Sequence, residues 1–504
     1  MADTVLVRSD LEERREAEAE LAASLEGEPS AEPLALAQPE DKPFSSLVPA
    51  IIGAANLMQT LSATVIANAL PAMAITLHQS PISLNTTITI YLLALAIFLP
   101  VSGWAADRFG AKRVFLVAIV LYAASCAACG FATNMPELLL ARFAEGAAGA
   151  LMGPVGRLVL LRTTPKHDLV RAMSVLTMPS LLGPVIGPPI GGFIVTYMSW
   201  RWIFFLNIPI AIMGVILVSK YINDIKEEDA GKLDWVGMIL TGIGLAAVVF
   251  GFENLGRANM PAYAPYGLLG VGLALLAVYA AYARRTPHAI LDLKLFRIPT
   301  FYASIVGGTF MRMGVGATPF LLALLLQVAF GLSPFQAGMM TFASAAAALV
   351  MKSSAPPILA RFGFRNTLTV NAVIVGLTFM SYAILTGSTP HWLIYLILLT
   401  GGFFRSLQFT ALNGLGYADI EQPQMSRAST MSAMGQRLSQ SIGIGFAAML
   451  LRLFQGHAHK VTAATVSPTF LIIGAVALVS AGFFFALPKD AGASLNGRPQ
   501  RVRA

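Results

Sequence analysis

Ionisable side chains inside long apolar stretches are the residues of this chain best suited to chemistry. A charge near the centre of a bilayer costs several kcal/mol, so such residues are usually paired or functional. The candidates are Arg142, Glu145, Arg157, Arg312, Lys352, Arg405 and Arg437. Glu145 is the only carboxylate that the sequence places well inside an apolar stretch.

Arg142 and Glu145 stand three residues apart, which puts both on one face of a helix. A neighbouring arginine keeps a carboxylate ionised, whereas removal from water favours its neutral form. A group that carries a proton across a membrane needs this balance to change between two states. Two interpretations of Glu145 stay open: a proton carrier and a structural partner of Arg142.

The surrounding stretches predict an all-α polytopic membrane protein. About fourteen apolar stretches lie between Leu47 and Leu487, each near the roughly 20 residues that a helix needs to cross a bilayer. The composition agrees, with 56% hydrophobic and 12% charged residues. The predicted spans are Leu47–Met73, Thr86–Ala106, Val114–Thr133, Glu137–Leu161, Val170–Met198, Trp202–Ile222, Trp235–Asn254, Pro265–Ala283, Phe301–Phe330, Phe335–Ile358, Thr367–Thr386, His391–Leu415, Arg427–Phe454 and Pro468–Leu487.

Basic residues alternate between the connecting loops, and Lys and Arg accumulate on the cytoplasmic side of a membrane protein. One set of loops contains Lys112, Arg113, Arg162, Lys166, Arg171, Lys226, Lys232, Arg284, Arg285, Lys294, Arg297, Arg361 and Arg365. Four intervening loops, at residues 75–85, 134–136, 331–334 and 387–390, contain no basic residue, and two others contain only Arg201 and Arg257. The pattern predicts that both termini lie in the cytoplasm.

The first 43 residues differ in charge from the rest of the chain. They contain 12 acidic and 4 basic residues, against 14 acidic and 30 basic residues in the remainder. The segment lacks an apolar core, so we do not expect a cleaved signal peptide. A solvated, disordered tail and a docking element for a cytoplasmic partner are both open. Topology and anionic lipid explain the basic excess of the body, and we expect no nucleic-acid binding.

Two further groups of residues could bind metal. Cys126 and Cys129 form a CxxC on a predicted span, but their neighbours are small and no further ligand stands nearby, so packing residues are the favoured interpretation. His457 and His459 stand in a predicted outer loop without nearby Cys or carboxylate. The sequence therefore predicts no metal site, no cofactor and no catalytic residue.

A short motif occurs twice. GWAADRFGAKR covers Gly103–Arg113, and the related ILARFGFRN covers Ile358–Asn366. The recurrence of Arg-Phe-Gly predicts two related halves. The charged residues of the first copy are expected to hold the loop at the cytoplasmic face.

The first copy resembles the cytoplasmic gating-loop motif of the major facilitator superfamily. The matching residues, called the gating loop below, are Gly103, Asp107, Arg108, Gly110, Lys112 and Arg113. Three more segments are similar to signatures of that family's fourteen-span drug:proton antiporter branch: TLSATVIANALP (Thr60–Pro71), GPVIGPPIGG (Gly183–Gly192) and WRWIFFLNIP (Trp200–Pro209).

The resemblance implies a major facilitator fold of two six-helix bundles with two inserted helices, hence 14 transmembrane helices, and alternating access to a central cavity. The expected organisation is an acidic cytoplasmic tail at 1–44, an N-terminal bundle at 45–222, a linker with the inserted helices at 223–298, a C-terminal bundle at 299–488 and a basic cytoplasmic tail at 489–504.

The predicted fifth span carries the antiporter motif, with Gly183, Pro184, Gly187, Pro188, Gly191 and Gly192. Three of these glycines recur every fourth residue, on one helix face, and permit close helix packing, while the prolines remove helical hydrogen bonds. A passive tight contact and a hinge that seals the bundles against each other are both open.

The chain departs from the branch at two positions. Ser62 stands where the branch usually has Asp in the first span, and Glu145 stands where the family pattern has Gln. Arg142 matches the family's conserved fourth-span Arg. Either Glu145 has taken over proton coupling, or coupling is weak or absent.

The expected function is export of amphipathic small molecules in exchange for protons from a bacterial inner membrane. The expected cavity residues are Met58, Gln59, Ser62, Phe310, Arg312, Phe320, Gln327, Phe404, Arg405, Gln408 and Arg437. The expected partners are substrate, protons and membrane lipids. Two possibilities are left open: a complex with an envelope adaptor protein, and a monomer without one. The alternatives are a uniporter, an exporter of one lipid-like metabolite, and a transporter-like sensor. A membrane transferase would need carboxylates and longer outer loops than this chain has.

Overall fold

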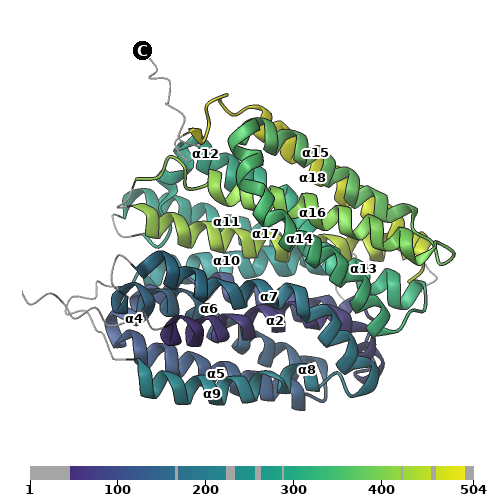
Figure 1. The fold of residues 1–504 in the computed structure, drawn as a ribbon, viewed down its shortest axis with the longest axis horizontal. Coiled ribbons are helices and arrows are strands. Elements are labelled where there is room, and N and C mark those ends of the chain that lie inside the picture. The colour runs from purple at the N-terminus through teal and green to yellow at the C-terminus, as the bar shows by residue number, and fades with distance from the viewer. Residues whose placement is uncertain are drawn as a thin grey trace, which may run out of the picture. The chain divides into compact units, whose positions relative to one another are not determined.

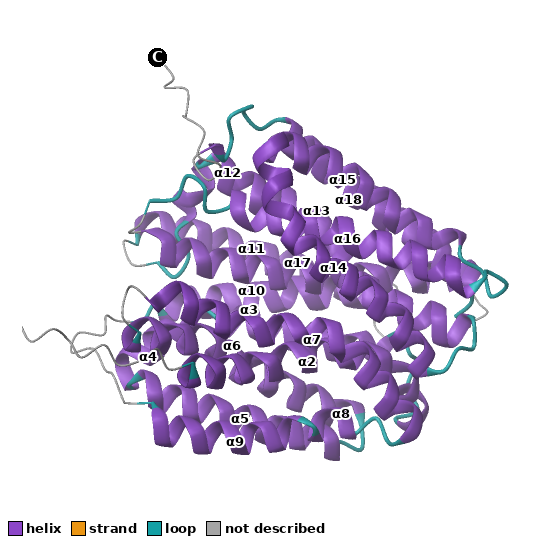
Figure 2. Ribbon diagram, in the orientation of Figure 1, coloured by secondary structure: helices purple, strands orange, loops and turns teal. Residues whose placement is uncertain are grey.

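The computed structural model describes residues 46–164, 168–222, 233–255, 261, 263–286, 289–421, 424–455 and 461–493, and the regular elements in these ranges are helices (Figures 1 and 2). The predictions for the acidic tail, for His457 and His459 and for most of the basic tail concern residues outside the described ranges.

A helix covers each of the fourteen predicted stretches. The first six are α2 (Leu47–Thr76), α3 (Thr86–Phe98) with α4 (Val101–Phe109), α5 (Ala111–Phe131), α6 (Met135–Thr163), α7 (Leu169–Tyr197), and α8 (Trp202–Phe205) with α9 (Asn207–Tyr221). The inserted pair is α10 (Trp235–Asn254) and α11 (Tyr263–Arg285). The last six are α12 (Pro299–Tyr302) continued by η4 (Ala303–Gly307), α13 (Gly308–Ala323) and η5 (Leu324–Ala329), then α14 (Pro334–Phe362), α15 (Phe364–Ser381), α16 (His391–Leu415), α17 (Met425–Gln455) and α18 (Ala463–Phe485).

The helices are long and apolar enough for a polytopic membrane protein. Among the described residues, 12 single helices qualify as spans, and the pair Ser83–Phe98 and Val101–Phe109, bent by 54°, raises the number to 13. The remaining predicted span is α17, which is more polar. Its polar groups lie against other helices: Ser439 Oγ donates to Thr309 Oγ1 at 3.0 Å, and Ser441 Oγ donates to the Thr89 carbonyl at 3.3 Å. The total of 14 spans stays a prediction.

The two sets of six helices pack by the same rules. In each set the first helix contacts the fifth and sixth, the second contacts the fourth, and the third contacts the fourth and sixth. The two sets contact each other where α7 packs on α14 and where α3 packs on α17. In both contacts the fifth helix of one set packs on the second helix of the other. This equivalence is expected of two halves related by pseudo-twofold symmetry. The inserted α10 and α11 pack on each other, and α10 also contacts α3 and α17.

The repeated motif adopts a related backbone in both halves. Gly110 separates α4 from α5 with φ +93°, and Gly363 separates α14 from α15 with φ +76°. Only glycine adopts positive φ without a steric cost, so each copy needs its glycine to turn the chain between the second and third helix of its half. The predicted internal repeat is confirmed at these two turns.

Candidate functional site

A buried charge cluster lies inside the first six helices, at the residues that the sequence singled out. Arg142 Nη1 lies 2.7 Å from Glu145 Oε2, and neither side chain is exposed to solvent. Ser62 Oγ, on α2, donates to Glu145 Oε1 at 2.5 Å. The residue at the position where the branch usually carries an acid therefore binds the acid that this chain carries on α6.

The guanidinium of Arg142 is held by the second helix as well. Its Nε donates to the Thr87 carbonyl at 3.1 Å, and its Cζ lies 4.2 Å from the centre of the Tyr91 ring. The ring of Phe204 lies 5.9 Å away on another side. Backbone carbonyls and aromatic faces both favour a cation, so the charge of Arg142 is stabilised in the protein interior as one half of an ion pair.

Cys129 is a member of this cluster that the sequence did not identify. Its Sγ donates to Glu145 Oε2 at 3.5 Å. The prediction treated Cys129 and Cys126 only as small packing residues, and both are indeed buried thiols. The spacing of α5 and α6 along the chain gives no signal for this contact, because the side chains meet only when the helices pack.

Glycines of α6 allow the cluster to form. A Cβ atom at Gly146 would collide with the Tyr91 carbonyl and the Ala94 side chain of α3, and one at Gly149 would press on the Gln59 amide of α2. Gln59 Nε2 also donates to the Gly149 carbonyl at 2.8 Å. The close approach of α2 and α6 brings the short Ser62 side chain within reach of Glu145.

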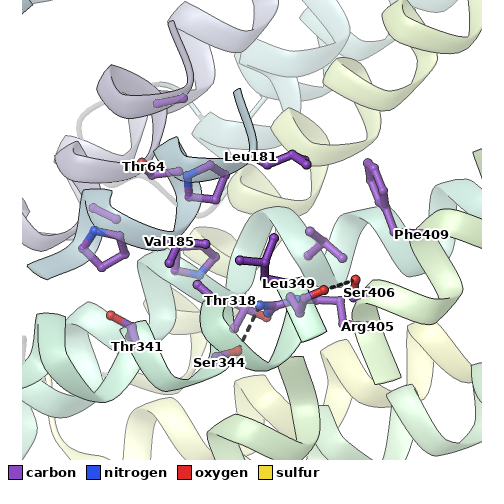
Figure 3. A pocket seen from close by; sticks show the side chains of 18 of the residues that line it. Thr64, Leu181, Val185, Thr318, Thr341, Ser344, Leu349, Arg405, Ser406 and Phe409 are labelled. Carbon is purple, nitrogen blue, oxygen red and sulfur yellow. Dashed lines mark hydrogen bonds between the residues drawn. The ribbon is translucent and has the colours of Figure 1, made fainter. Parts of the chain in front are cut away.

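A second site, a cavity of about 330 Å³, lies between the two halves (Figure 3). Its walls come from α2 and α7 on one side and from α13, α14 and α16 on the other. Most lining residues are apolar or carry a hydroxyl group, such as Leu181, Val185, Thr318 and Phe409. The charged residues among them are Lys352 and Arg405.

Helix α2 separates the cavity from the charge cluster. Ala63, Thr64 and Ala67 line the cavity, whereas Ser62 contacts Glu145. Because successive helical residues are rotated by ~100°, Thr64 and Ala67 point roughly away from Ser62. A ligand in the cavity would not touch Glu145, and the two sites share the rigid helix between them.

Of the cavity residues expected from the sequence, Arg405 lines this cavity, and the others are not among its lining residues. Gln408 is fully buried and pairs with Asn371, Phe310 stacks on Phe483, and Arg312 donates to the Ser304 carbonyl in η4 at 2.8 Å. The remaining residues are Met58, Gln59 and Ser62 near the charge cluster, Phe320 in the core, Gln327 bound to Asn68, Phe404 beside Phe403, and half-buried Arg437 on α17. Arg157 is exposed on α6.

Two contacts of the gating loop lie within the first half. Asp107 Oδ1 pairs with Arg162 Nη2 at 2.9 Å, and Lys112 Nζ donates to the Ser219 carbonyl at 2.9 Å. A Cβ atom at Gly103 would meet nothing within 4 Å, so no close helix contact requires a glycine at this position. Arg108 is exposed, and Arg113 stands at the start of α5.

The glycines of the antiporter motif contact two different partners. A Cβ atom at Gly183, Gly187 or Gly191 would collide with Thr60, Thr64 or Val65 of α2, respectively. One at Gly192 would instead collide with Pro334 and Phe335 of α14, in the other half. Pro179, Pro184, Pro188 and Pro189 lie within α7. Helix α7 therefore packs tightly on its own half along one face and on the opposite half along another.

Contacts between the halves gather toward the predicted outer end, where the loops contain few basic residues. Gln327 Nε2 donates to the Asn68 carbonyl at 3.1 Å, and the Phe335 amide donates to Thr196 Oγ1 at 3.0 Å. Asn68 Nδ2 donates to the Pro188 carbonyl at 3.0 Å, and Gly338 packs on the same carbonyl. These contacts hold α2 and α7 against η5 and α14 beside the cavity.

A second buried carboxylate, Glu253 on α10, was missed by the sequence analysis. It is 1% exposed and accepts hydrogen bonds from Thr86 Oγ1 and, at 3.0 Å, from Thr89 Oγ1 of the second helix. Arg452 of α17 donates to its backbone carbonyl. Glu253 stands at the end of an apolar stretch, where the sequence alone does not distinguish a buried carboxylate from one that is exposed to solvent at a helix end.

Comparison with known proteins agrees with this architecture. The family model described as Major Facilitator Superfamily matches residues 52–448. A protein of Pectobacterium atrosepticum named "Putative multidrug resistance protein MdtD" is 33% identical over 437 residues, which cover 86% of this chain and 94% of that protein. "Probable transport protein HsrA" of Haemophilus influenzae is 35% identical over 398 residues, covering 79% and 86%.

Solved structures agree at the level of the fold. A D-xylose-proton symporter aligns with TM-score 0.63 and 14% identity, covering 88% of this chain and 98% of that one. A bacterial homologue of the lysosomal transporter Spinster, in an inward-facing and unoccupied conformation, aligns with TM-score 0.63 and 14% identity, covering 92% and 100%. With a family model that spans most of the chain and relatives above 30% identity over 79% and 86% of it, this chain belongs to the Major Facilitator Superfamily.

Proposed function

We propose that the protein is a secondary active exporter of amphipathic small molecules, of the multidrug efflux type, which takes up protons in exchange. The observation that carries this proposal is the contact of Glu145 with both Ser62 and Arg142 in a site without solvent exposure. The names of the relatives from Pectobacterium and Haemophilus support export and transport. The mostly apolar cavity between the halves supports an amphipathic substrate.

Glu145 is suited to carry the proton because its environment penalises a change of charge. In the described state its two oxygens accept hydrogen bonds from Ser62, Arg142 and Cys129. Protonation would leave the Arg142 cation without its counter-ion, and breaking such a buried pair costs about 3 to 5 kcal/mol. Proton uptake therefore requires a conformation in which water reaches the cluster.

Helix α2 couples the proton to the substrate. Protonated Glu145 would loosen its bonds to Arg142, on the same helix, and to Ser62, whose bond holds α2 against α6 on the side away from the cavity. Movement of α2 changes the cavity wall at Thr64 and Ala67, and also the packing of α2 on the glycines of α7. The outer contacts between the halves, at Asn68 and Gln327, would then open in the other state of an alternating-access cycle.

Accumulation of a fluorescent amphiphile by inverted membrane vesicles tests this function. We expect uptake that depends on an imposed proton gradient and stops when a protonophore is added. Uptake that follows only the substrate gradient would instead favour the uniporter, for which the serine at position 62 is the supporting observation. Specific binding without any flux would favour the sensor.

A further inference from the structure

We infer that the cavity binds amphipathic anions: small molecules with an apolar body and one carboxylate or sulfonate group. The inference rests on the proposed export function and assigns a substrate class to it. The observation behind it is the presence of two cations, Lys352 on α14 and Arg405 on α16, among the residues that line the cavity.

The charge of the described lining is entirely positive. Lys352 and Arg405 line the cavity, and no Asp or Glu is among its described lining residues. No ion pair joins either cation to a carboxylate of the described residues. Arg405 Nη2 donates to Ser344 Oγ at 3.1 Å, as Figure 3 shows, and this contact directs the guanidinium along the cavity wall.

Both cations stand deep within their helices. Lys352 precedes the end of α14 at Phe362 by ten residues, and Arg405 precedes the end of α16 at Leu415 by ten residues. At 1.5 Å per residue, each lies about 15 Å from that end of its helix. Because α14 and α16 both run from the predicted outer side toward the predicted cytoplasmic side, the two charges lie at a similar depth. Charges at such depth typically face a water-filled cavity or a ligand.

The remaining walls suit an apolar body. Leu181 and Val185 of α7, Leu322 of α13 and Leu349 of α14 line the cavity, and Phe409 adds an aromatic face. A cationic amphiphile would meet two like charges without a compensating carboxylate. Glu145 does not supply one, because it lies on the other side of α2 and is paired with Arg142. The cavity therefore discriminates against cations and in favour of anions.

Charge movement follows from this assignment. Export of a monoanion in exchange for one proton moves two elementary charges across the membrane in each cycle, whereas export of a neutral compound moves one. At the same proton stoichiometry, the membrane potential contributes twice as much to anion export, and each charge is worth about 2.3 kcal/mol per 100 mV.

Calorimetric titration of the purified full-length protein tests the binding class. The anionic probe is 8-anilinonaphthalene-1-sulfonate, and the cationic probe is rhodamine 6G. We expect the sulfonate to bind the parent and to bind Lys352→Gln or Arg405→Gln at least tenfold more weakly. Lys352→Arg should retain the affinity. Lys220→Gln, at the end of α9 outside the cavity, is the matched control and should bind as the parent does.

Equal sulfonate affinity in Lys352→Gln and the parent, with both proteins folded, would overturn the inference. If Arg405→Gln does not fold, the comparison of Lys352→Gln with Lys352→Arg decides alone. A phospholipid presents the same chemistry, so the titration is repeated in nanodiscs of phosphatidylcholine with and without phosphatidylglycerol. Unchanged sulfonate affinity supports a small-molecule site. Loss of sulfonate binding with phosphatidylglycerol assigns the cations to lipid and overturns the inference.

Transport assays separate this inference from the export function on which it rests. Gradient-driven transport of rhodamine 6G, unaltered by Lys352→Gln, would overturn the anion assignment and leave the exporter intact. Transport of neither probe by the parent, despite sulfonate binding that depends on Lys352, would contradict export and leave the anion site supported.

Discussion

Ser62 Oγ lies 2.5 Å from Glu145 Oε1, across the contact between α2 and α6. The first-span position that is usually acidic in this branch and the acid on the fourth span therefore belong to one site. A carboxylate on either helix would occupy nearly the same space beside Arg142. This proximity supports the hypothesis that Glu145 on α6 replaces the acid that the branch usually carries on the first span.

The exchange of acids predicts partial rescue. Ser62→Asp in a Glu145→Gln background returns a carboxylate to the site, so we expect it to recover part of the proton-driven accumulation. Ser62→Asp alone would place two carboxylates beside one arginine, and we expect it to lower the rate because like charges disfavour joint ionisation. Vesicle uptake at matched expression measures both. Failure of Ser62→Asp to rescue, in a folded protein, would mean that the position of the acid matters as well as its presence.

Membrane topology can be tested with cysteine labelling at sites that the structure shows to be accessible. Phe109→Cys lies at the end of α4, next to Arg108 and Gly110 of the gating loop, at a residue that is 54% exposed, and Ser388→Cys lies at an exposed position of a predicted outer loop. The native Cys126 and Cys129 are buried and should not react. A membrane-impermeant maleimide added to whole cells should label Ser388→Cys and leave Phe109→Cys unlabelled. The reverse result would invert the predicted topology.

We expect the gating loop to affect the equilibrium between the conformations of the transport cycle, and not the stability of the fold. Asp107→Asn removes a partly exposed ion pair with Arg162, and such pairs contribute about 0.2–1 kcal/mol. One kcal/mol corresponds to roughly a fivefold change in a conformational equilibrium. We expect transport to fall by up to that factor with normal membrane insertion, and Arg285→Gln to serve as a neutral control. Unchanged turnover in Asp107→Asn at equal expression would contradict a gating role.

Packing of α7 on α2 should not tolerate an added methyl group. Gly187→Ala would bring a Cβ atom against Thr64, and overpacking of this kind costs about 1–3 kcal/mol. Gly270→Ala on α11 is the control, since a Cβ atom there would meet nothing within 4 Å. Thermal unfolding of the purified variants measures the difference. Equal stability of the two variants would show that α7 and α2 can move apart without a loss of thermal stability.

The junction at Glu253 should hold the inserted helices to the rest of the protein. Glu253→Gln replaces a carboxylate that accepts from Thr86 and Thr89, and hydrogen bonds to charged groups contribute about 1.5–3 kcal/mol. We expect a lower unfolding temperature and faster proteolysis of the segment between α10 and α11. Stability equal to that of the parent would mean that the carboxylate is dispensable for docking α10.

The sequence predicted the helices well because an apolar run of sufficient length has few alternatives to a membrane helix. It also identified Arg142 and Glu145, whose charges stand out in apolar surroundings. It could not pair Ser62 with Glu145, because that contact depends on how α2 and α6 align in depth. The cavity lining was largely missed for a related reason: in helices that are apolar on all faces, periodicity does not separate the side toward lipid from the side toward a cavity. Arg405 was found because it is charged.

The central claim is that Glu145 carries the proton, and Glu145→Gln tests it most directly. Inverted vesicles containing the parent, Glu145→Gln or the exposed control Glu137→Gln are given a proton gradient and a fluorescent amphiphile that the parent accumulates. Our account predicts that Glu145→Gln binds the amphiphile and supports counterflow but does not accumulate it, while Glu137→Gln behaves as the parent does. Gradient-driven accumulation by Glu145→Gln at the parental level would contradict the account and leave Glu145 as a structural partner of Arg142.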